Sequence, residues 1–158
     1  MALQAGEPAP TFTLPDQQGR PWSLEAQRPH PVVLYFYPRD ETPGCTTQAC
    51  DIRDHWSAFT EAGAHVAGIS PDDVDSHARF AAHHDLPHTL LADPERTVID
   101  AYGAWGEKVR FGKTSMGVLR SSVVIDGEGQ LAAVFAAIKP AEQSAKALEV
   151  VRSLLDRS

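Results

Sequence analysis

The two cysteines of the chain lie five positions apart in the stretch TPGCTTQAC, and they are the residues best suited to covalent chemistry. Their spacing is wider than the C-x-x-C of a dithiol oxidoreductase. Five residues of an α-helix rise about 7.5 Å, whereas a disulfide requires a Cα separation of about 4.4–6.8 Å. An intact helix therefore cannot carry a bond between Cys45 and Cys50.

Their positions make the two cysteines chemically unequal. Cys45 follows a buried-strand pattern and a Pro-Gly turn, which predicts that it lies in the first turn of a helix. Free backbone N–H groups and the positive end of the helix dipole favour a thiolate there. Cys50 lies one and a half turns further on, where the dipole has less effect. We expect Cys45 to attack and Cys50 to follow, although free cysteines are also common as plain core residues.

The elements on either side must position Cys45. The run PVVLYFYP predicts a central strand over Val32–Tyr37, buried on both faces and ended by Pro38. After the loop, apolar residues recur at spacings of three and four, which predicts one helix ending near Gly63. The residues on its apolar face are Ala49, Ile52, Trp56 and Phe59.

The rest of the chain alternates between strand and helix patterns. PTFTLPDQQGRPWSL predicts an N-terminal β-hairpin. AHVAGIS and HTLLADP predict strands, whereas PDDVDSHARFAAHH and ERTVIDAYG predict helices. LRSSVVIDGEGQLAAVFA predicts a second hairpin, and the remaining residues predict a closing helix with Leu148, Val151 and Leu155 on one face. The order indicates an α/β protein with a mixed sheet flanked by helices, compatible with a thioredoxin-like fold.

Composition restricts the classes of function. The 158 residues, 42% of them apolar, are expected to form a single domain over 1–158 with its own core. A formal net charge of −7 argues against nucleic acid or an anionic membrane as the main partner. No apolar run reaches the length of a membrane span, and the N-terminal residues lack the pattern of a signal peptide. We therefore expect a cytoplasmic protein whose thiols are kept reduced.

The segment YFYPRDETPGCTTQACDIRD resembles the active-site signature of the peroxiredoxins, and within them the Q type, or bacterioferritin comigratory protein family, in its atypical 2-Cys form. The specific motif is Pro38-x-x-x-Thr42-x-x-Cys45. Residues 69–95 and 102–129 are also similar to that family in order and spacing. Gln48 stands where many relatives carry Glu, so the charge of a carboxylate is lost at this position.

The resemblance implies a role for each matching residue. Cys45 would be the peroxidatic cysteine and Cys50 the resolving one. Thr42 would hold the sulfur and the peroxide by hydrogen bonds, and Pro38 would shield the site. Arg120 matches the family's arginine from a distant strand, and its permanent charge and fork of donors suit that role. Without the resemblance, Arg120 would be interpreted as a solvated charge at a strand edge.

The same resemblance implies a reaction and its partners. Hydrogen peroxide and organic hydroperoxides would be reduced to water and alcohols, which protects the cell against oxidative stress. Cys45 would become a sulfenic acid and then an intramolecular disulfide with Cys50, recycled by thioredoxin or a similar dithiol. The helix spacing predicts that the first turns unwind in each cycle. The resemblance implies a monomer, and the chemistry requires no metal or other cofactor.

Two other classes of function use the same cysteine pair. A redox sensor or chaperone-like protein would oxidise once without fast recycling. A thioredoxin-type disulfide oxidoreductase would reduce insulin, although the missing C-x-x-C argues against it.

The histidines and aspartates of the central region have less specific interpretations. His83, His84 and His88 could suggest a metal site, but Pro87 interrupts the helix and no third ligand is evident nearby, so none is predicted. The acidic residues Asp72, Asp73 and Asp75 are interpreted as helix caps. The three tryptophans, Trp22, Trp56 and Trp105, are expected to pack in the core or at its rim.

Overall fold

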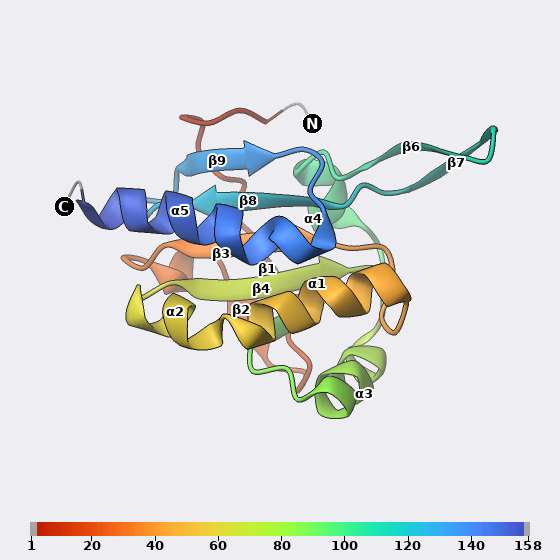
Figure 1. The fold of residues 1–158 in the computed structure, drawn as a ribbon, viewed down its shortest axis with the longest axis horizontal. Helices are drawn as coiled ribbons and strands as arrows, with labels where there is room; N and C mark the ends of the chain where they lie inside the picture. Colours follow the sequence, from red (N-terminus) through yellow and green to blue (C-terminus); the bar gives the residue numbers. More distant parts are fainter. Residues whose placement is uncertain (1–2, 157–158) are drawn as a thin grey trace.

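The computed structural model describes residues 3–156 and contains a central five-stranded mixed sheet (Figure 1). The strand β3 (Val32–Phe36) lies in the middle and pairs in parallel with β4 (His65–Ser70), which pairs in parallel with β5 (Thr89–Ala92). On its other side, β3 pairs antiparallel with β8 (Ser121–Ile125), and β8 with β9 (Leu131–Phe135). The predicted mixed α/β sheet is confirmed.

The first face of the sheet is covered by the N-terminal hairpin and a short helix. Val32, Leu34 and Phe36 of β3 point to this side. The hairpin joins β1 (Thr13–Pro15) to β2 (Pro21–Ser23), as predicted, and is followed by a 3-10 turn at Glu25–Gln27. The helix α4 (Thr97–Ala101) contributes Val98 and Ile99 to the same core.

The second face is covered by the remaining helices, against which Val33, Tyr35 and Tyr37 pack. The elements on this side are α1 (Pro43–Asp54), α2 (Trp56–Glu61), α3 (Val74–His84), and α5 (Gln143–Asp156) after a 3-10 turn at Pro140–Glu142. The helices α1 and α5 lie side by side over the sheet (Figure 1). The backbone N–H of Ser144 in α5 donates to the Asp51 carboxylate of α1 at 2.8 Å, which fixes the two helices together.

The prediction of one helix from Cys45 to Gly63 was wrong, because the chain forms two helices that meet at His55. The ring Nδ1 of His55 lies 2.8 Å from the carbonyl oxygen of Asp51, and the hydroxyl of Ser144 donates to the same oxygen at 3.0 Å. The same oxygen also accepts the backbone N–H of His55 at 3.2 Å, so three groups share it at the point where α1 ends. The chain turns at His55, and Trp56 and Phe59 still reach the core from α2.

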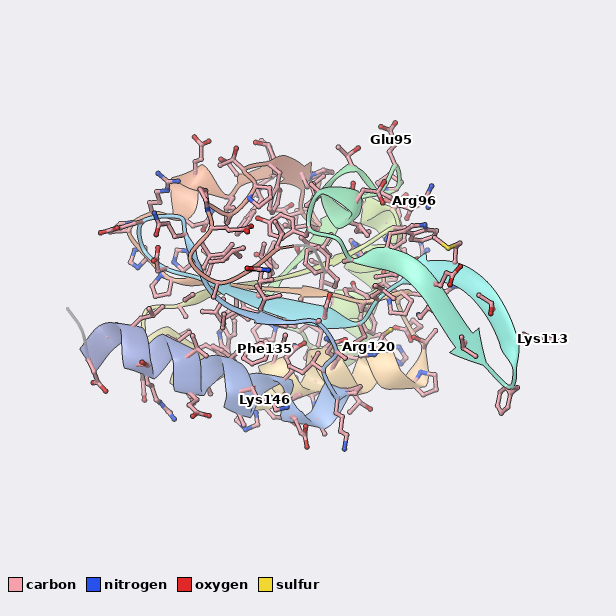
Figure 2. All side chains as sticks on the ribbon, turned by 90° about the horizontal axis from the view of Figure 1, so that it is seen from above. Glu95, Arg96, Lys113, Arg120, Phe135 and Lys146 are labelled. Atoms are coloured by element: carbon pink, nitrogen blue, oxygen red, sulfur yellow. The ribbon has the colours of Figure 1, made fainter. Side chains whose placement is uncertain are left out.

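A hairpin that the sequence did not predict projects from the body of the protein. It joins β6 (Trp105–Arg110) to β7 (Lys113–Val118), and Lys113 lies near its far tip (Figure 2). Phe111 at the turn has a φ of 53° and is 98% exposed. Because most of the hairpin lies outside the core, its sequence lacks the apolar alternation that marks a half-buried strand.

The closing helix and the cap assignments differ in detail from the sequence expectations. Leu148 and Val151 are buried, but Leu155 is 43% exposed because the end of α5 extends past the sheet. Arg157 and Ser158, at the end of the predicted helix, lie outside the described residues. Asp73 caps α3 by accepting the N–H of Ser76, whereas Asp72 accepts the N–H of Asp40.

The three tryptophans, Trp22, Trp56 and Trp105, are partly buried against the two cores, as expected. Within residues 3–156, no helix has both the length and the apolar character needed to cross a membrane.

Candidate active site

Cys45 lies in the first turn of α1, directly after the loop that leaves the central strand β3. Thr42 occupies the N-cap position and Pro43 begins the helix. Proline suits this position because its missing N–H would have no helical partner. The side chain of Cys45 is fully buried in the second core. The sequence correctly placed it at a helix N-terminus, where backbone N–H groups and the dipole stabilise negative charge.

Arg120 brings a positive charge to the sulfur from the segment between β7 and β8. Its Nη2 donates to Cys45 Sγ at 3.5 Å, and its Nη1 donates to Gln48 Oε1 at 2.7 Å. Close approach is possible because residue 44 is glycine: a Cβ on Gly44 would lie 3.0 Å from Nη2. Arg120 is therefore part of the Cys45 environment, and its interpretation as a solvated edge charge is wrong.

A chain of buried amides holds the guanidinium in place. Gln48 is fully buried and donates through Nε2 to Oε1 of Gln143, the first residue of α5. Its Oε1 is thereby turned toward Arg120. The sequence analysis did not identify Gln143, and a glutamine at the start of an amphipathic helix carries no pattern that would have revealed it. The orientation of Arg120 thus depends on the packing of α5 against α1.

The hydroxyl of Thr42 is engaged with the loop rather than with the sulfur. Its Oγ1 donates to the carbonyl oxygen of Arg39 at 2.8 Å. A hydroxyl that donates its proton in this way still has lone pairs with which to accept a hydrogen bond.

Pro38, two residues after the end of β3, borders a hollow of about 450 Å³ beside the loop that leads to α1. Trp105, Val109 and Met116 of the projecting hairpin line its other side. The hollow is therefore largely apolar and is formed between the loop and the hairpin.

Cys50 is partly buried on the same helix, and both thiols are free. The helix α1 is continuous from Pro43 to Asp54. At a rise of 1.5 Å per residue, Cys45 and Cys50 are too far apart along its axis for a disulfide. The geometric conflict that the sequence predicted is therefore present in this form of the protein.

A buried polar network fixes the loop that carries Thr42. The Asp40 carboxylate accepts the hydroxyl of Tyr37 at 2.6 Å and lies 2.7 Å from Nδ1 of His77. The other ring nitrogen of His77 lies 2.9 Å from the carbonyl oxygen of Leu91. Burial, with smaller contributions from Tyr35 and Asp40, raises the pKa of Tyr37 well above its usual value, so Tyr37 stays a neutral donor. The sequence analysis missed this network, because its members are distant in sequence.

The three histidines considered as a metal group do not all come together, because His88 lies outside the cluster formed by His83 and His84. His88 is buried and hydrogen-bonds through Nε2 to the hydroxyl of Tyr35 at 2.6 Å. Burial lowers the pKa of His88 to about 3, so it is neutral at physiological pH. His83 and His84 lie at the end of α3, next to Glu41.

Comparisons with known proteins agree with this geometry. Residues 5–134 match the AhpC/TSA family. The chain is 38% identical over 157 residues to the peroxiredoxin Bcp of Bacillus subtilis, covering 99% of this chain and 100% of that protein. A crystal structure of peroxidoxin BcpB from Mycobacterium tuberculosis superposes with a TM-score of 0.86 at 36% identity, covering 96% of this chain and 98% of that one.

A further solved structure concerns the alkyl peroxide reduction activity of the Xanthomonas campestris bacterioferritin comigratory protein. It superposes with a TM-score of 0.87 at 31% identity and covers 94% of this chain and 98% of that one. A cysteine at a helix N-terminus, an arginine directed at its sulfur, and these relatives lead to one assignment. The chain belongs to the AhpC/TSA family and, within it, to the Q-type peroxiredoxins, and it is a thiol-dependent peroxidase.

Proposed function

We propose that Cys45 is the peroxidatic cysteine and that Arg120 is the main group stabilising the charge that develops during its reaction. The observation that carries the proposal is the 3.5 Å contact between Arg120 Nη2 and Cys45 Sγ at the start of α1. The Cys45 thiolate attacks one oxygen of the hydroperoxide, and the O–O bond breaks. The products are a Cys45 sulfenic acid and an alkoxide or hydroxide, which takes up a proton to leave as alcohol or water.

The surrounding donors suit the charge flow of this step. As the O–O bond lengthens, negative charge moves from sulfur to the leaving oxygen, and preorganised donors stabilise it. The guanidinium has several N–H donors, so it can hold sulfur and oxygen together. Because the Thr42 hydroxyl donates to Arg39, its oxygen is available to accept the O–H of hydrogen peroxide or of a hydroperoxide. Pro38 limits the access of water to the loop.

We further propose that Cys50 resolves the sulfenic acid. The Cys50 thiol attacks the Cys45 sulfenic sulfur, a disulfide forms, and water leaves. Because α1 separates the two sulfurs, the helix must unwind from its N-terminal end for this step. Full burial of Cys45 supports the same conclusion, since a protein reductant cannot reach its sulfur in the folded form. A dithiol of the thioredoxin type then reduces the exposed disulfide.

The apolar hollow beside Pro38 suits the organic part of a hydroperoxide. The Xanthomonas relative is named for alkyl peroxide reduction. Trp105, Val109 and Met116 would contact an alkyl or aryl group while its peroxide faces Cys45. A Met116→Ser variant is expected to lose reactivity with cumene hydroperoxide and to keep its reactivity with hydrogen peroxide.

The cellular setting is also a proposal. We infer that residues 1–158 form one domain that acts as a cytoplasmic monomer in protection against peroxides. The relatives match almost the whole chain, and two free thiols suit a reducing compartment.

The test is peroxide consumption by the wild type, Cys45→Ser and Cys50→Ser with a thioredoxin system. Cys45→Ser should be inactive, whereas Cys50→Ser should react once and then stall unless small thiols are added. Full turnover by Cys45→Ser would refute the assignment of the nucleophile. A wild type that oxidises once and is not recycled would instead indicate a redox sensor.

A further inference from the structure

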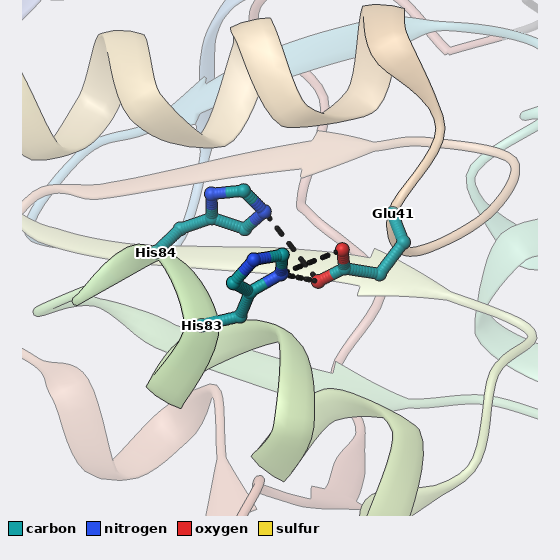
Figure 3. Close-up of side chains that lie close together, drawn as sticks. All are labelled: Glu41, His83 and His84. Carbon is teal, nitrogen blue, oxygen red and sulfur yellow. Dashed lines mark hydrogen bonds and ion pairs between the residues drawn. The ribbon is translucent and has the colours of Figure 1, made fainter.

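We propose that Glu41, His83 and His84 form a binding site for a divalent transition-metal ion of the zinc type, next to the Cys45 loop. The three side chains come from two elements and converge on one another (Figure 3). Glu41 belongs to the loop before α1, and the two histidines end α3. Each can supply one ligand atom, and these atoms lie within 4.8 Å of one another.

The separations are close to those that a zinc ion requires. With Zn–N and Zn–O bonds of about 2.0–2.2 Å, ligand atoms at tetrahedral angles lie about 3.4 Å apart. His83 Nδ1 lies 2.9 Å from Glu41 Oε2, and His84 Nε2 lies 3.4 Å from Glu41 Oε1. Small side-chain rotations therefore suffice to place all three ligands around one ion.

His84 Nε2 gives a second, independent indication. The atom is shielded from solvent and makes no hydrogen bond to any residue between positions 3 and 156. Buried polar atoms nearly always have a hydrogen-bond partner, whereas the contact of this nitrogen with Glu41 Oε1, at 3.4 Å, is an ion pair without hydrogen-bond geometry. Because it faces a carboxylate and a second imidazole, a cation that accepts its lone pair is the partner that the geometry favours.

The surroundings allow a positive ion and leave room for water ligands. A hollow of about 490 Å³ adjoins Glu41 and His83. Its charged lining comprises three carboxylates and two guanidiniums, namely Asp40, Glu41, Asp72, Arg39 and Arg79. Arg53 also lies close, donating to the His84 carbonyl oxygen at 2.9 Å. The arginines reduce the attraction for a cation, so direct coordination by the imidazoles must supply most of the affinity.

A second cluster of possible metal ligands lies nearby but is less suitable. Asp40, Asp72 and His77 also lie close enough together to be considered. Both ring nitrogens of His77, however, are already engaged, with Asp40 and with the Leu91 carbonyl oxygen. A metal ion could bind His77 only by displacing one of these contacts. Imidazole ligands favour zinc and its neighbours over magnesium or calcium, which prefer oxygen.

The site would connect peroxide turnover to the metal, and this consequence rests on the proposed function. Glu41 directly precedes Thr42, the N-cap of α1. An ion bound to Glu41 and to α3 would fix the loop from which α1 must unwind. Metal binding should therefore slow formation of the Cys45–Cys50 disulfide and leave the first oxidation of Cys45 unchanged.

The binding experiment uses Zn²⁺ in calorimetric titration and Co²⁺ as an optical probe. Both are added to the Cys45→Ser/Cys50→Ser variant, so that thiolates cannot bind the metal. We expect one equivalent to bind, and millimolar Mg²⁺ not to compete. Adding Glu41→Gln, His83→Ala or His84→Ala should weaken binding by at least the 10–100-fold that loss of an outer-sphere partner typically costs. The exposed residues His30 and Glu61 provide matched controls, because His30→Ala and Glu61→Gln should not change the affinity.

The functional arm measures the two oxidation steps of the wild type and of His83→Ala with and without Zn²⁺. We expect Zn²⁺ to slow disulfide formation in the wild type and to have a much smaller effect in His83→Ala. Equal inhibition of both would overturn the coupling. Affinity unchanged by the ligand substitutions would overturn the site itself. If the metal-free wild type does not reduce peroxide, the proposed function fails, while the calorimetric result still decides the metal site.

Discussion

Replacing Arg120 is the sharpest test of the proposed activation of Cys45. The substitution Arg120→Gln removes the charge 3.5 Å from the sulfur while keeping a side chain able to form hydrogen bonds. At that distance and an effective dielectric constant of about 20, the attraction between guanidinium and thiolate is about 5 kcal/mol. Arg120 is only partly buried, so solvent reduces this value. Loss of one preorganised donor typically costs about 2.7–4 kcal/mol, or 10²–10³-fold in rate.

We therefore expect the second-order rate constant of Cys45 with hydrogen peroxide to fall by about 10²-fold. Arg120→Lys keeps the charge but cannot reach Sγ and Gln48 Oε1 together, so we expect an intermediate loss of about tenfold. The assay is rapid mixing with peroxide, followed by trapping of the sulfenic acid and intact-mass measurement. It isolates the first oxidation from recycling.

The control is Arg152→Gln, which removes an exposed arginine of α5 and should leave the rate unchanged. Circular dichroism and the thermal midpoint must show that the Arg120 variants remain folded. If folded Arg120→Gln reacts within about threefold of the wild type, the electrostatic reasoning is refuted, because about 0.6 kcal/mol is too little for a charge in contact with the sulfur.

Other predictions follow from single contacts. Gly44→Ala introduces a Cβ 3.0 Å from Arg120 Nη2, so the rate constant for the reaction with peroxide should fall several-fold. The thermal midpoint should stay the same or rise, because alanine has a higher helix propensity than glycine. An unchanged rate constant would contradict the close approach of Arg120 to Gly44. Asp40→Ala leaves His77 buried without its carboxylate, which should cost about 3–5 kcal/mol in the free energy of unfolding by urea titration. The pKa of His88 is about 3 in the folded protein, far below its unfolded value of about 6.5, so its contribution to stability is present above pH 6.5 and is lost as the pH falls. The free energy of unfolding should drop by about 2 kcal/mol from this group between pH 7 and pH 5, and a His88→Gln variant with the same pH slope as the wild type would disprove it.

Much of the fold could be predicted because local pattern and tertiary position agree. The continuous apolar run of β3 is buried on both faces, as predicted. The strands β8 and β9 lie on either side of the DGEG turn and pair antiparallel, as the turn sequence predicted. The predictions failed where side chains from distant segments decide the outcome. The Asp51 carbonyl oxygen, one turn before the break at His55, accepts the hydroxyl of Ser144, which is 93 positions away in the chain. The β6–β7 hairpin was missed because β7 is mostly exposed and the two strands carry little hydrophobic alternation.

In the candidate site, too, local features could be predicted from the sequence, whereas contacts between distant residues could not. Position alone identified Cys45 as a helix N-terminal residue, and helix geometry alone showed that Cys50 is out of reach on an intact α1. The resemblance, rather than any local pattern, singled out Arg120. Nothing in the sequence indicated that Gln143 orients this arginine through Gln48, or that Asp40 and His77 fix the loop.

The sequence by itself therefore placed Cys45 at the start of a helix and revealed the conflict between the spacing of the two cysteines and a disulfide. Both follow from helix rise and backbone dipoles, which depend only on local spacing. Only the tertiary structure decided which charges surround the sulfur and which side chains meet Glu41. Those contacts join residues 42 to 95 positions apart, and their energies depend on distance and burial, which a linear pattern does not encode.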